Sequence, residues 1–491
     1  MSSIIKDGHV FVTNPSTLEE IAKIKCSTSS EVEHLILESR LYKKWSVLTL
    51  KQRCYYINRL RKTIVKNQDE LKQIIKKETG KKDFDILIEL FSLLEHLKEI
   101  SKIARKALRK EPRNTGLMKS KKAYVVYEPL GVAGIIAPWN YPLTTPISSS
   151  VEALLAGNNI ILKPSEHTPL TSLFIKKLWD QNIGFSNAFN ILIGGGDVGE
   201  MIVQSKDIDI ICFTGSTNVG KKIAKQCGNM LKPVILELGG KDPMIILEDA
   251  NINRAVESAI FGGFSNVGQT CISVEEVFIE KPIFDLFVDK ISDRVKKMSS
   301  GNNDDMDLGA MIMKQNCDKV REHIDEIDDK DKIIKGSSID HPMYIAPTIV
   351  VDPAEDLRIV NEETFGPIIS LRSFIDEKHL LKLVHKTGYG LAGSIFGKNK
   401  NRINRILRQL KIGNVSINDV FTHYGIASLP FGGEGLSGLG RLHGKEGLRS
   451  LCRTKSVVEN RFQFLNEPWW YGRPAFIERL LNFFLKKYYN I

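Results

Sequence analysis

Cys271 is a candidate nucleophile because its neighbours differ from those of a buried apolar cysteine. It lies in GFSNVGQTCIS, where small and polar residues leave room for a substrate to approach the sulfur. A lone cysteine usually fills an apolar core, and that interpretation suits Cys212 in the strand-like run DIICF. Because a thiolate can attack a carbonyl carbon, this pattern indicates covalent catalysis through Cys271.

Glu237 is a second candidate because it ends the apolar run VILEL and is followed by Gly239-Gly240-Lys241. A carboxylate at the end of an apolar strand costs free energy unless it is paired or functional. A buried structural ion pair is therefore the open alternative to a functional role.

Two glycine-containing stretches could bind phosphate. GGGDVG at 194–199 matches G-x-G-x-x-G, but the next strand ends in Thr214 rather than in an acidic residue, so we interpret these glycines as a loop. FTGST at 213–217 is the better candidate, since a strand end there passes through glycine into a helix N-terminus. Lys163 and Glu166 in LKPSE follow another strand and suit ribose hydroxyls.

The elements that must position these residues change in type along the chain. Apolar residues three and four apart predict helices over 31–45, 51–79 and 83–110. Further along, short apolar runs alternate with helical ones, and we expect strands at 133–137, 159–162, 189–193, 209–213, 233–238 and 244–247, then at 275–279, 368–372, 392–396 and 414–417. Unbroken apolar strands alternating with helices are typical of α/β domains with a parallel sheet covered on both faces.

Together these motifs form a recognisable pattern, and the chain resembles the aldehyde dehydrogenase superfamily from about residue 14 to 464. The resemblance rests on motifs in family order: PWNYP (138–142), LKPSE (162–166), FTGST (213–217), LELGGK (236–241), GQTC (268–271), EETFGP (362–367) and PFGGEGLSGLG (430–440). The stretch NDVFTHYGIASLPFGG and the apolar extension after it are most similar to the fatty-aldehyde branch. NPSTLEEIAKI near the N-terminus resembles the longer soluble members.

The resemblance implies roles for individual residues. Cys271 would be the nucleophile, Glu237 the general base, and the side-chain amide of Asn140 a donor to the oxyanion. Cofactor-contacting positions of the family match Trp139, Lys163, Glu166, Gly215, Ser216, Glu363 and Phe365. The cofactor would be NAD, with NADP an open alternative, since a carboxylate at Glu166 suits a 2′-hydroxyl and repels a 2′-phosphate.

The implied reaction is NAD(P)-dependent oxidation of an aldehyde, apolar or long-chain, to its carboxylic acid through a cysteine thiohemiacetal and a thioester. A CoA-acylating or semialdehyde dehydrogenase is an alternative, although CoA acylation dispenses with the base and Glu237 is present. A non-catalytic cofactor-binding scaffold is another, and intact Cys271, Glu237 and Asn140 argue against it.

The resemblance also implies the domain organisation. We expect a doubly wound parallel-sheet cofactor domain (1–110 and 130–238), a second α/β catalytic domain (239–440), a small β oligomerisation arm (111–129 and 453–464) and an amphipathic tail (465–491). The arm strands KSKKAYVVY and KSVV would pair with another subunit of a homodimer or homotetramer, and ordinary edge strands are the alternative.

The tail carries adjacent tryptophans and a segment with polar positions on one helical face, namely Glu478, Arg479, Asn482, Lys486 and Asn490. Its opposite face carries Phe476, Ile477, Leu480, Leu481, Phe484 and Tyr488. Such a helix suits a membrane surface, with Trp469 and Trp470 at headgroup depth. A helix packed on the protein itself or on a partner subunit is an equal alternative.

Composition limits the remaining possibilities. The 491 residues exceed a single small domain, and a hydrophobic fraction of 42% excludes wholesale disorder. Seven cysteines without a C-x-x-C pair, and an N-terminus without a signal-peptide core, predict a cytoplasmic protein, peripheral on the inner face of a membrane if the tail binds lipid. The net charge of +11 is spread over a long chain, so we expect no nucleic-acid partner, and the histidine spacing predicts no metal site.

Overall fold

A computed structural model describes residues 4–329, 332–462, 467 and 469–488. The chain divides into two compact units: Met1–Leu108 with Glu128–Arg453, and Arg109–Tyr127 with Thr454–Ile491. The predicted arm and tail fall largely in the second unit. Parts of both predictions, including Asn490, lie outside the described residues.

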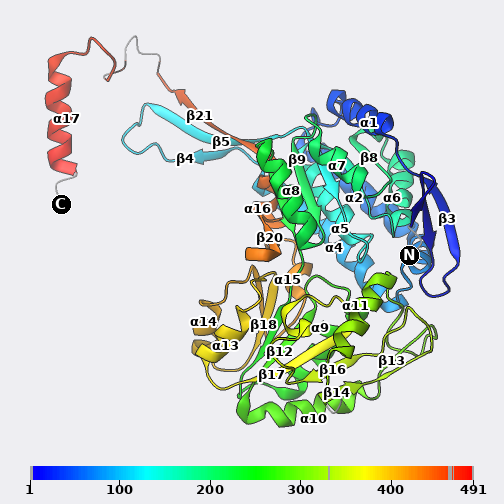
Figure 1. Ribbon diagram of the computed structural model, residues 1–491. Coiled ribbons are helices and arrows are strands. Elements are labelled where there is room, and N and C mark those ends of the chain that lie inside the picture. Colours follow the sequence, from blue (N-terminus) through cyan, green and yellow to red (C-terminus); the bar gives the residue numbers. More distant parts are fainter. Residues whose placement is uncertain (1–3, 330–331, 463–466, 468, 489–491) are drawn as a thin grey trace. The chain divides into compact units, whose positions relative to one another are not determined.

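The first unit begins with a small sheet and a group of helices (Figure 1). The sheet, which the sequence analysis did not predict, contains β1 (Ile5–Lys6), β2 (His9–Thr13) and β3 (Glu20–Lys25). The helices are α1 (Ser29–Leu41), α2 (Leu50–Lys66), α3 (Gln68–Thr79) and α4 (Asp83–Ala107). The single helix predicted over 51–79 is wrong, because Asn67 leaves helical geometry and ends α2 before α3 begins.

A six-stranded sheet forms the centre of the N-terminal half, in the order β20-β10-β9-β6-β7-β8. Its strands are β6 (Val132–Ile136), β7 (Asn159–Lys163), β8 (Phe189–Ile191), β9 (Ile210–Thr214), β10 (Val234–Glu237) and β20 (Gly438–Leu439). All pairs are parallel except β10 with β20. Although β20 falls in the range predicted for the catalytic domain, it joins this sheet.

Helices cover the six-stranded sheet. Apolar residues of α1, α7 (Gly196–Gln204) and α8 (Thr217–Asn229) form one core with β7 and β9. α5 (Thr144–Ala156) contacts β6 and β7, and α6 (Pro169–Asn182) contacts β8. Since α7 begins at Gly196, the predicted loop at 194–199 is wrong for the last residues of that motif.

A seven-stranded sheet forms the second half, in the order β14-β16-β17-β12-β11-β18-β19. Its strands are β11 (Asp242–Ile246), β12 (Val274–Glu280), β14 (Ile333–Lys335), β16 (Thr348–Val351), β17 (Ile368–Phe374), β18 (Ala392–Phe396) and β19 (Asn414–Ile417). Only β14 pairs antiparallel. One core contains α9 (Ile252–Phe264) and α10 (Phe284–Val295), and another contains α13 (Glu377–Val384) and α14 (Lys400–Leu407). The predicted α/β fold with two parallel-sheet domains is confirmed.

The second unit holds a three-stranded sheet and a terminal helix. The sheet has the order β21-β5-β4, formed by β4 (Glu111–Arg113), β5 (Lys121–Pro129) and β21 (Cys452–Asn460). Lys121 bonds to both Asn460 and Glu467. The terminal helix is α17 (Ala475–Tyr488), and none of its described side chains is buried. In the part of the chain that the structure describes, no helix combines the length and apolarity needed to cross a membrane.

Candidate active site

The predicted motifs meet between the two large sheets. Asn140, Glu166, Gly215 and Glu237 stand at or just after the carboxyl ends of β6, β7, β9 and β10. Cys271 precedes β12, and EETFGP (362–367) precedes β17. Ligands of open α/β sheets bind outside the carboxyl ends of the strands, so this arrangement defines the candidate site.

Cys271 and Glu237 lie within contact distance. Glu237 is the last residue of β10, and the Cys271 thiol donates to its Oε1 across 3.6 Å. Burial raises the pKa of the Cys271 thiol well above its ordinary value, and the nearby carboxylates of Glu237, Asp242 and Glu363 raise it further. The thiol therefore keeps its proton near neutral pH until a base removes it.

The Glu237 carboxylate is suited to be that base. Burial raises the pKa of Glu237, and the charge of His443 offsets part of the rise. Within the described residues, no lysine or arginine forms an ion pair with Glu237, so the structural ion pair considered from sequence is not observed. A buried carboxylate without a cationic partner can accept a proton from a thiol or from water.

Hydrogen bonds connect Asn140 with the chain segment that carries Cys271. Its side-chain amide donates to the Gln269 carbonyl at 2.9 Å, and the Asn266 side chain donates to the Asn140 carbonyl at 3.1 Å. The hydroxyls of Tyr141 and Thr270 are 2.8 Å apart. An amide nitrogen carries two N–H groups, so one donor of Asn140 remains available after the bond to Gln269.

A buried glutamate fixes the start of α5, just after Asn140. Glu89 Oε1 accepts the backbone N–H groups of Leu143 at 2.9 Å and Thr144 at 3.1 Å, and its Oε2 lies 2.5 Å from Lys81 Nζ. Because an anion at a helix N-terminus satisfies N–H groups that have no partner in the helix, Glu89 fixes the position of the loop that carries Asn140.

The turn before Cys271 has an unusual backbone. Asn266 and Val267 adopt φ of 51° and 58°, and Gly268 follows with φ of 68°. A Cβ on Gly268 would lie 2.2 Å from the Gly366 carbonyl oxygen, so only glycine fits there. Backbone strain of this kind is typical of functional sites, where the surrounding contacts hold it in place.

Lys163 and Glu166 form one part of the predicted cofactor site. Lys163 Nζ lies 3.2 Å from Glu166 Oε2. Although burial raises it, the pKa of Glu166 is held below its ordinary value by the Lys163 charge. An ionised carboxylate beside an ammonium group can bind ribose hydroxyls as acceptor and donor.

The FTGST motif also has the expected geometry. The Gly215 N–H donates to the Glu237 carbonyl at 3.0 Å, and a Cβ at Gly215 would lie 2.6 Å from the Phe213 ring. Ser216 is the N-cap of α8, but its side chain makes no capping hydrogen bond. The start of α8 therefore fits an anion such as a phosphate.

The other predicted cofactor positions lie nearer the thiol. The rings of Trp139 and Phe365 are 5.4 Å apart and nearly perpendicular. Glu363 accepts the Gly240 N–H at 3.0 Å, and burial together with Glu275 raises the pKa of Glu363 to about 7. The structure thus brings all ten predicted site residues to the same region between the sheets.

A second contact joins the segments that carry Glu237 and Cys271. Lys241 Nζ lies 2.8 Å from Glu275 Oε2, and both side chains are buried. Glu275 also accepts the N–H groups of Thr364 and Phe365 at 2.8 Å. This carboxylate is fully paired, unlike Glu237.

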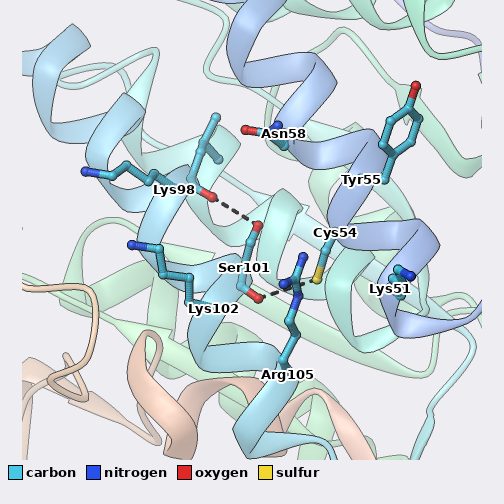
Figure 2. Close-up of a pocket in the computed structure, with 9 residues that line it drawn as sticks. Lys51, Cys54, Tyr55, Asn58, Lys98, Ser101, Lys102 and Arg105 are labelled. Carbon is cyan, nitrogen blue, oxygen red and sulfur yellow. Dashed lines mark hydrogen bonds between the residues drawn. The ribbon is translucent and has the colours of Figure 1, made fainter.

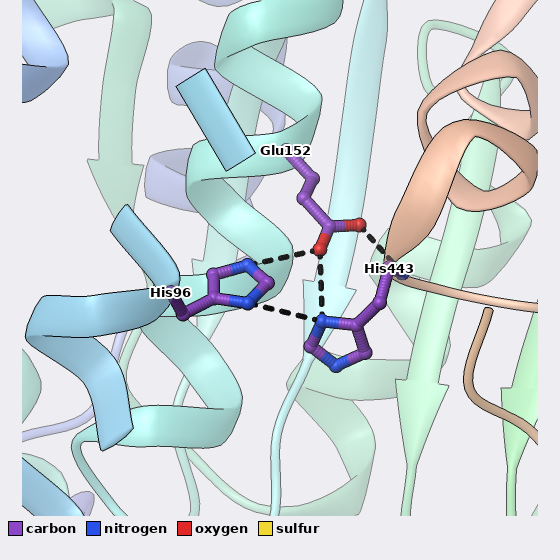
Figure 3. Close-up of side chains that lie close together, drawn as sticks. All are labelled: His96, Glu152 and His443. Carbon is purple, nitrogen blue, oxygen red and sulfur yellow. Dashed lines mark hydrogen bonds and ion pairs between the residues drawn. The ribbon is translucent and has the colours of Figure 1, made fainter. Parts of the chain in front are cut away.

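The sequence analysis missed two groups of residues near the thiol. Tyr424, Phe421 and Cys271 itself pack against a buried apolar cluster of Ile272, Leu391, Ala392 and Phe431. A buried polar cluster of His96, Glu152 and His443 lies in the same unit (Figure 3). Phe421, Tyr424 and Phe431 lie in stretches that the sequence analysis quoted only for the resemblance, whereas no motif marks His96 and Glu152, which come from separate helices.

One cavity lies apart from these residues. It has a volume of about 380 Å³ and is lined by side chains of α2 and α4, among them Cys54, Asn58, Ser101 and Arg105 (Figure 2). The Cys54 thiol donates to the Ser101 carbonyl at 3.4 Å. No predicted site residue lines this cavity, so we assign it no role in the chemistry.

Comparison with known proteins gives consistent results. Residues 5–457 match the aldehyde dehydrogenase family. A Mycobacterium tuberculosis protein, provisionally named NADP-dependent succinate-semialdehyde dehydrogenase, is 32% identical over 94% of this chain and 90% of its own length. The 4,4'-diapolycopene aldehyde oxidase of Methylomonas is 31% identical over 95% of this chain and 86% of its own. Betaine aldehyde dehydrogenase of Staphylococcus aureus, solved in complex with NAD+, has a TM-score of 0.86 and 30% identity, over 94% of this chain and 93% of that one.

Proposed function

The chain belongs to the aldehyde dehydrogenase family and is an oxidoreductase that acts on aldehydes with NAD or NADP; we propose that its substrates are apolar aldehydes, oxidised to acids through a thioester on Cys271. The observation that carries this proposal is the apolar cluster packed around the thiol. Its members offer an aldehyde carbon chain dispersion contacts and no hydrogen bonds.

The proposed mechanism uses three side chains. Glu237 takes the proton from Cys271 Sγ, and the sulfur attacks the aldehyde carbon. The free N–H of the Asn140 amide stabilises the oxyanion that forms. Lys163, Glu166 and the start of α8 would hold a nicotinamide cofactor, which would supply the acceptor for the hydride that leaves this carbon. Glu237 must release that first proton to solvent before it can remove a proton from the water that cleaves the thioester, and the Cys271 sulfur leaves as the acid forms.

Exposed apolar residues support the substrate class. Phe84, Leu87, Ile88 and Phe91 form an exposed stripe on α4, and Phe91 is 70% exposed. The short helix α15 (Thr422–Gly425), which contains Tyr424, packs against α4. Phe261, also exposed, lies 5.6 Å from the ring of Phe421. We propose that an apolar path from these residues to the thiol takes the hydrocarbon chain of the substrate.

A panel of straight-chain aldehydes, assayed by nicotinamide absorbance with each cofactor, tests this proposal. Each buried methylene contributes about 0.8 kcal/mol, so kcat/KM should rise about fourfold per added methylene until the path is filled. Phe421→Ala should flatten this trend, whereas Ile375→Ala, at a distant exposed position, should not. A preference for succinate semialdehyde, whose carboxylate needs a cation, would contradict the apolar assignment.

The terminal helix supports a further proposal, that the protein binds a membrane surface. The apolar side chains of α17 are exposed, and Phe483 and Leu485 widen the face that holds Phe476, Leu480 and Phe484. Lys486 and Lys487 lie in the last turn. An interfacial helix buries such a face among acyl chains while its lysines attract anionic lipid.

Sedimentation with anionic phosphatidylglycerol vesicles tests the membrane proposal. Binding should weaken as salt rises, and Leu481→Asp should abolish it, whereas Val47→Asp, on the other unit, should leave it intact. The deletion of 466–491 should release the protein from vesicles and keep its rate on short aldehydes. Loss of oligomers and activity together would show instead that the tail is structural.

The three-stranded sheet supports the proposal of an oligomerisation arm. β21 lies at an edge of this sheet, and most of its side chains are exposed. An exposed edge strand offers unpaired backbone groups to a strand of another subunit. Alternate residues of an antiparallel strand face the same neighbour, and the Arg461 N–H donates to the Ser120 carbonyl beside β5, so the N–H of Val458 lies on the other side of β21. Val458→Pro removes that N–H and should shift the mass measured by light scattering toward the monomer; an unchanged mass would contradict this role.

A further inference from the structure

His443 is a buried histidine on the chain segment that follows the strand paired with Glu237. Gly438 of β20 lies opposite Glu237 of β10, and the chain continues from β20 to His443 at the start of α16 (Gly444–Ser450). His443 has φ of 58°, a conformation that L-residues adopt at a cost. Such strain persists only where surrounding contacts hold the residue in place.

Two polar contacts hold its side chain, one to Glu152 and one to His96. His443 Nδ1 lies 3.1 Å from Glu152 Oε1 and 3.2 Å from His96 Nδ1, and His96 Nε2 lies 3.0 Å from the same Glu152 oxygen. The backbone N–H of His443 donates to Glu152 Oε2 at 3.0 Å. Figure 3 shows that the second ring nitrogen of His443 points away from Glu152.

These contacts determine where the protons lie. Glu152 Oε1 lies at ion-pair distance from two ring nitrogens, so a hydrogen on His96 Nε2 and one on His443 Nδ1 each oppose the charge of an ionised carboxylate. His96 Nδ1 can then accept from His443 Nδ1, which makes His96 neutral. A second proton on His443 balances the buried charge of Glu152, whereas a neutral His443 would leave that charge uncompensated.

The pKa shifts of His96, His443 and Glu152 agree with this assignment of protons. Burial lowers the pKa of His96, and the neighbouring His443 lowers it further. Although burial lowers it, the pKa of His443 is raised overall by the charge of Glu152 and, to a lesser extent, by Glu237. Glu152 has a pKa of about 2, because both histidines outweigh the effect of its burial.

A packed aromatic residue connects this cluster with the thiol. The Tyr424 ring lies 5.2 Å from the His443 ring, and Tyr424 packs with Cys271 against Phe431. His443 and Glu237 are both buried, so their interaction is screened less than it would be at a surface.

We propose that His443, held in its protonated form by Glu152, is a positioning residue that keeps the Glu237 carboxylate ionised and able to take the proton of Cys271. This inference rests on the roles proposed for Cys271 and Glu237. The charge of Glu152 adds to the effect of burial on the pKa of Glu237, and the His443 imidazolium opposes both.

The titratable groups around this pair come from several elements. Glu152 of α5 and His443 face Glu237 along with the thiol of Cys271. Tyr424 of α15 faces both Glu237 and Cys271, and burial raises its pKa well above the ordinary value, so the phenol stays neutral. Asp242 and Glu363 face Cys271 from the opposite sheet. Of these groups, His443 alone is cationic.

His423 provides a matched control. It is also buried, and its ring stacks on Phe431 at 6.0 Å, while the His443 ring meets Phe431 edge-on at 5.9 Å. Its Nδ1 bonds to the Ser416 hydroxyl at 3.0 Å, and burial lowers the pKa of His423 to about 4. It is therefore neutral at neutral pH, so its loss removes bulk but no charge.

The test is the rate at which iodoacetamide alkylates Cys271 as a function of pH, measured by peptide mass spectrometry on the full-length protein. Neither aldehyde nor cofactor is present, so the result does not depend on the proposed substrate. Below the pKa of Glu237 the carboxylate is protonated and cannot accept the thiol proton, so the rate falls on the acid side. We call this low-pH part of the rate profile the acid limb. In His443→Gln the midpoint of the acid limb should lie about one pH unit higher.

Further variants distinguish the effect of the His443 charge from an effect on folding. Glu152→Gln removes the partner that holds the second proton on His443 and should move the limb in the same direction. His443→Lys restores a positive charge and should return it toward that of the unmodified protein. Thermal melting checks that each variant folds. An unchanged limb in folded His443→Gln or Glu152→Gln, or an equal shift in His423→Gln, would overturn the proposal.

Discussion

Two contacts join the same two chain segments, 237–241 and 271–275, and they differ in what satisfies the carboxylate. Glu275 has the Lys241 ammonium at 2.8 Å and two backbone N–H donors. Glu237 has only a thiol at 3.6 Å for a partner on the other segment. A fully paired buried carboxylate stabilises a fold, whereas one that faces a reactive thiol and has no lysine or arginine ion-pair partner can exchange protons. Within these two short segments, therefore, Glu237 is placed for proton transfer and Glu275 stabilises the packing.

The largest effect should come from Cys271→Ala. Without the sulfur no covalent intermediate can form, so aldehyde oxidation should fall to background while cofactor binding, measured by fluorescence quenching, stays nearly intact. Cys212→Ala should keep its activity, because Cys212 is buried within β9. Substantial turnover in the Cys271 variant, with Cys212 or Cys317 essential instead, would break the comparison.

Glu237→Gln should have the next largest effect. Glutamine keeps the shape but cannot accept a proton, so the steady-state rate should fall by about 10²–10⁴. In the unmodified enzyme, activity should be lost as pH falls through the raised pKa of Glu237, at a higher pH than for an exposed glutamate. A near-normal rate for the glutamine variant would exclude Glu237 as the base.

Asn140→Ala should cost about 10²–10³ in kcat, the usual effect of one lost oxyanion donor. Because its amide also bonds to the Gln269 carbonyl, the thermal midpoint must be measured beside the rate. Asn140→Asp, which keeps the size and loses the N–H, should be at least as slow. Full activity in either variant would exclude Asn140 from the reaction.

Lys241→Met should have the smallest effect on the chemistry and a large one on stability. It removes one partner of a buried ion pair, which costs about 3–5 kcal/mol of unfolding free energy in urea titrations. The kcat of the folded variant should change by no more than a few-fold. A stable but inactive variant would reverse the roles assigned to the two contacts.

Much of this architecture could be predicted from the sequence. Strands such as NIILK and IICFT contain apolar runs because both faces of the sheet are covered. Their positions could therefore be predicted from the pattern of apolar residues. Cys271 and Glu237 could be identified because small residues surround one and apolar residues precede the other. The fatty-aldehyde branch and the membrane role of the tail stay predictions.

Other features depend on contacts between distant residues. His96, Glu152 and His443 lie on α4, α5 and the segment before α16, and each alone resembles an ordinary polar residue. β20 has two residues, too few for a periodic pattern, and its place in the first sheet depends on pairing with β10. The break at Asn67 interrupts a continuous helical pattern because local hydrogen bonding, not composition, ends α2.

The most direct test of the central claim is mass spectrometry of the Cys271 peptide in Glu237→Gln after long incubation with excess aldehyde and NAD+. Slowed acylation can still reach completion, while the thioester lacks the base that would activate its water. We expect Cys271 to carry the acyl group, and mild hydroxylamine to remove it. Unmodified Cys271 beside released acid, or an acyl group on another cysteine, would contradict the account.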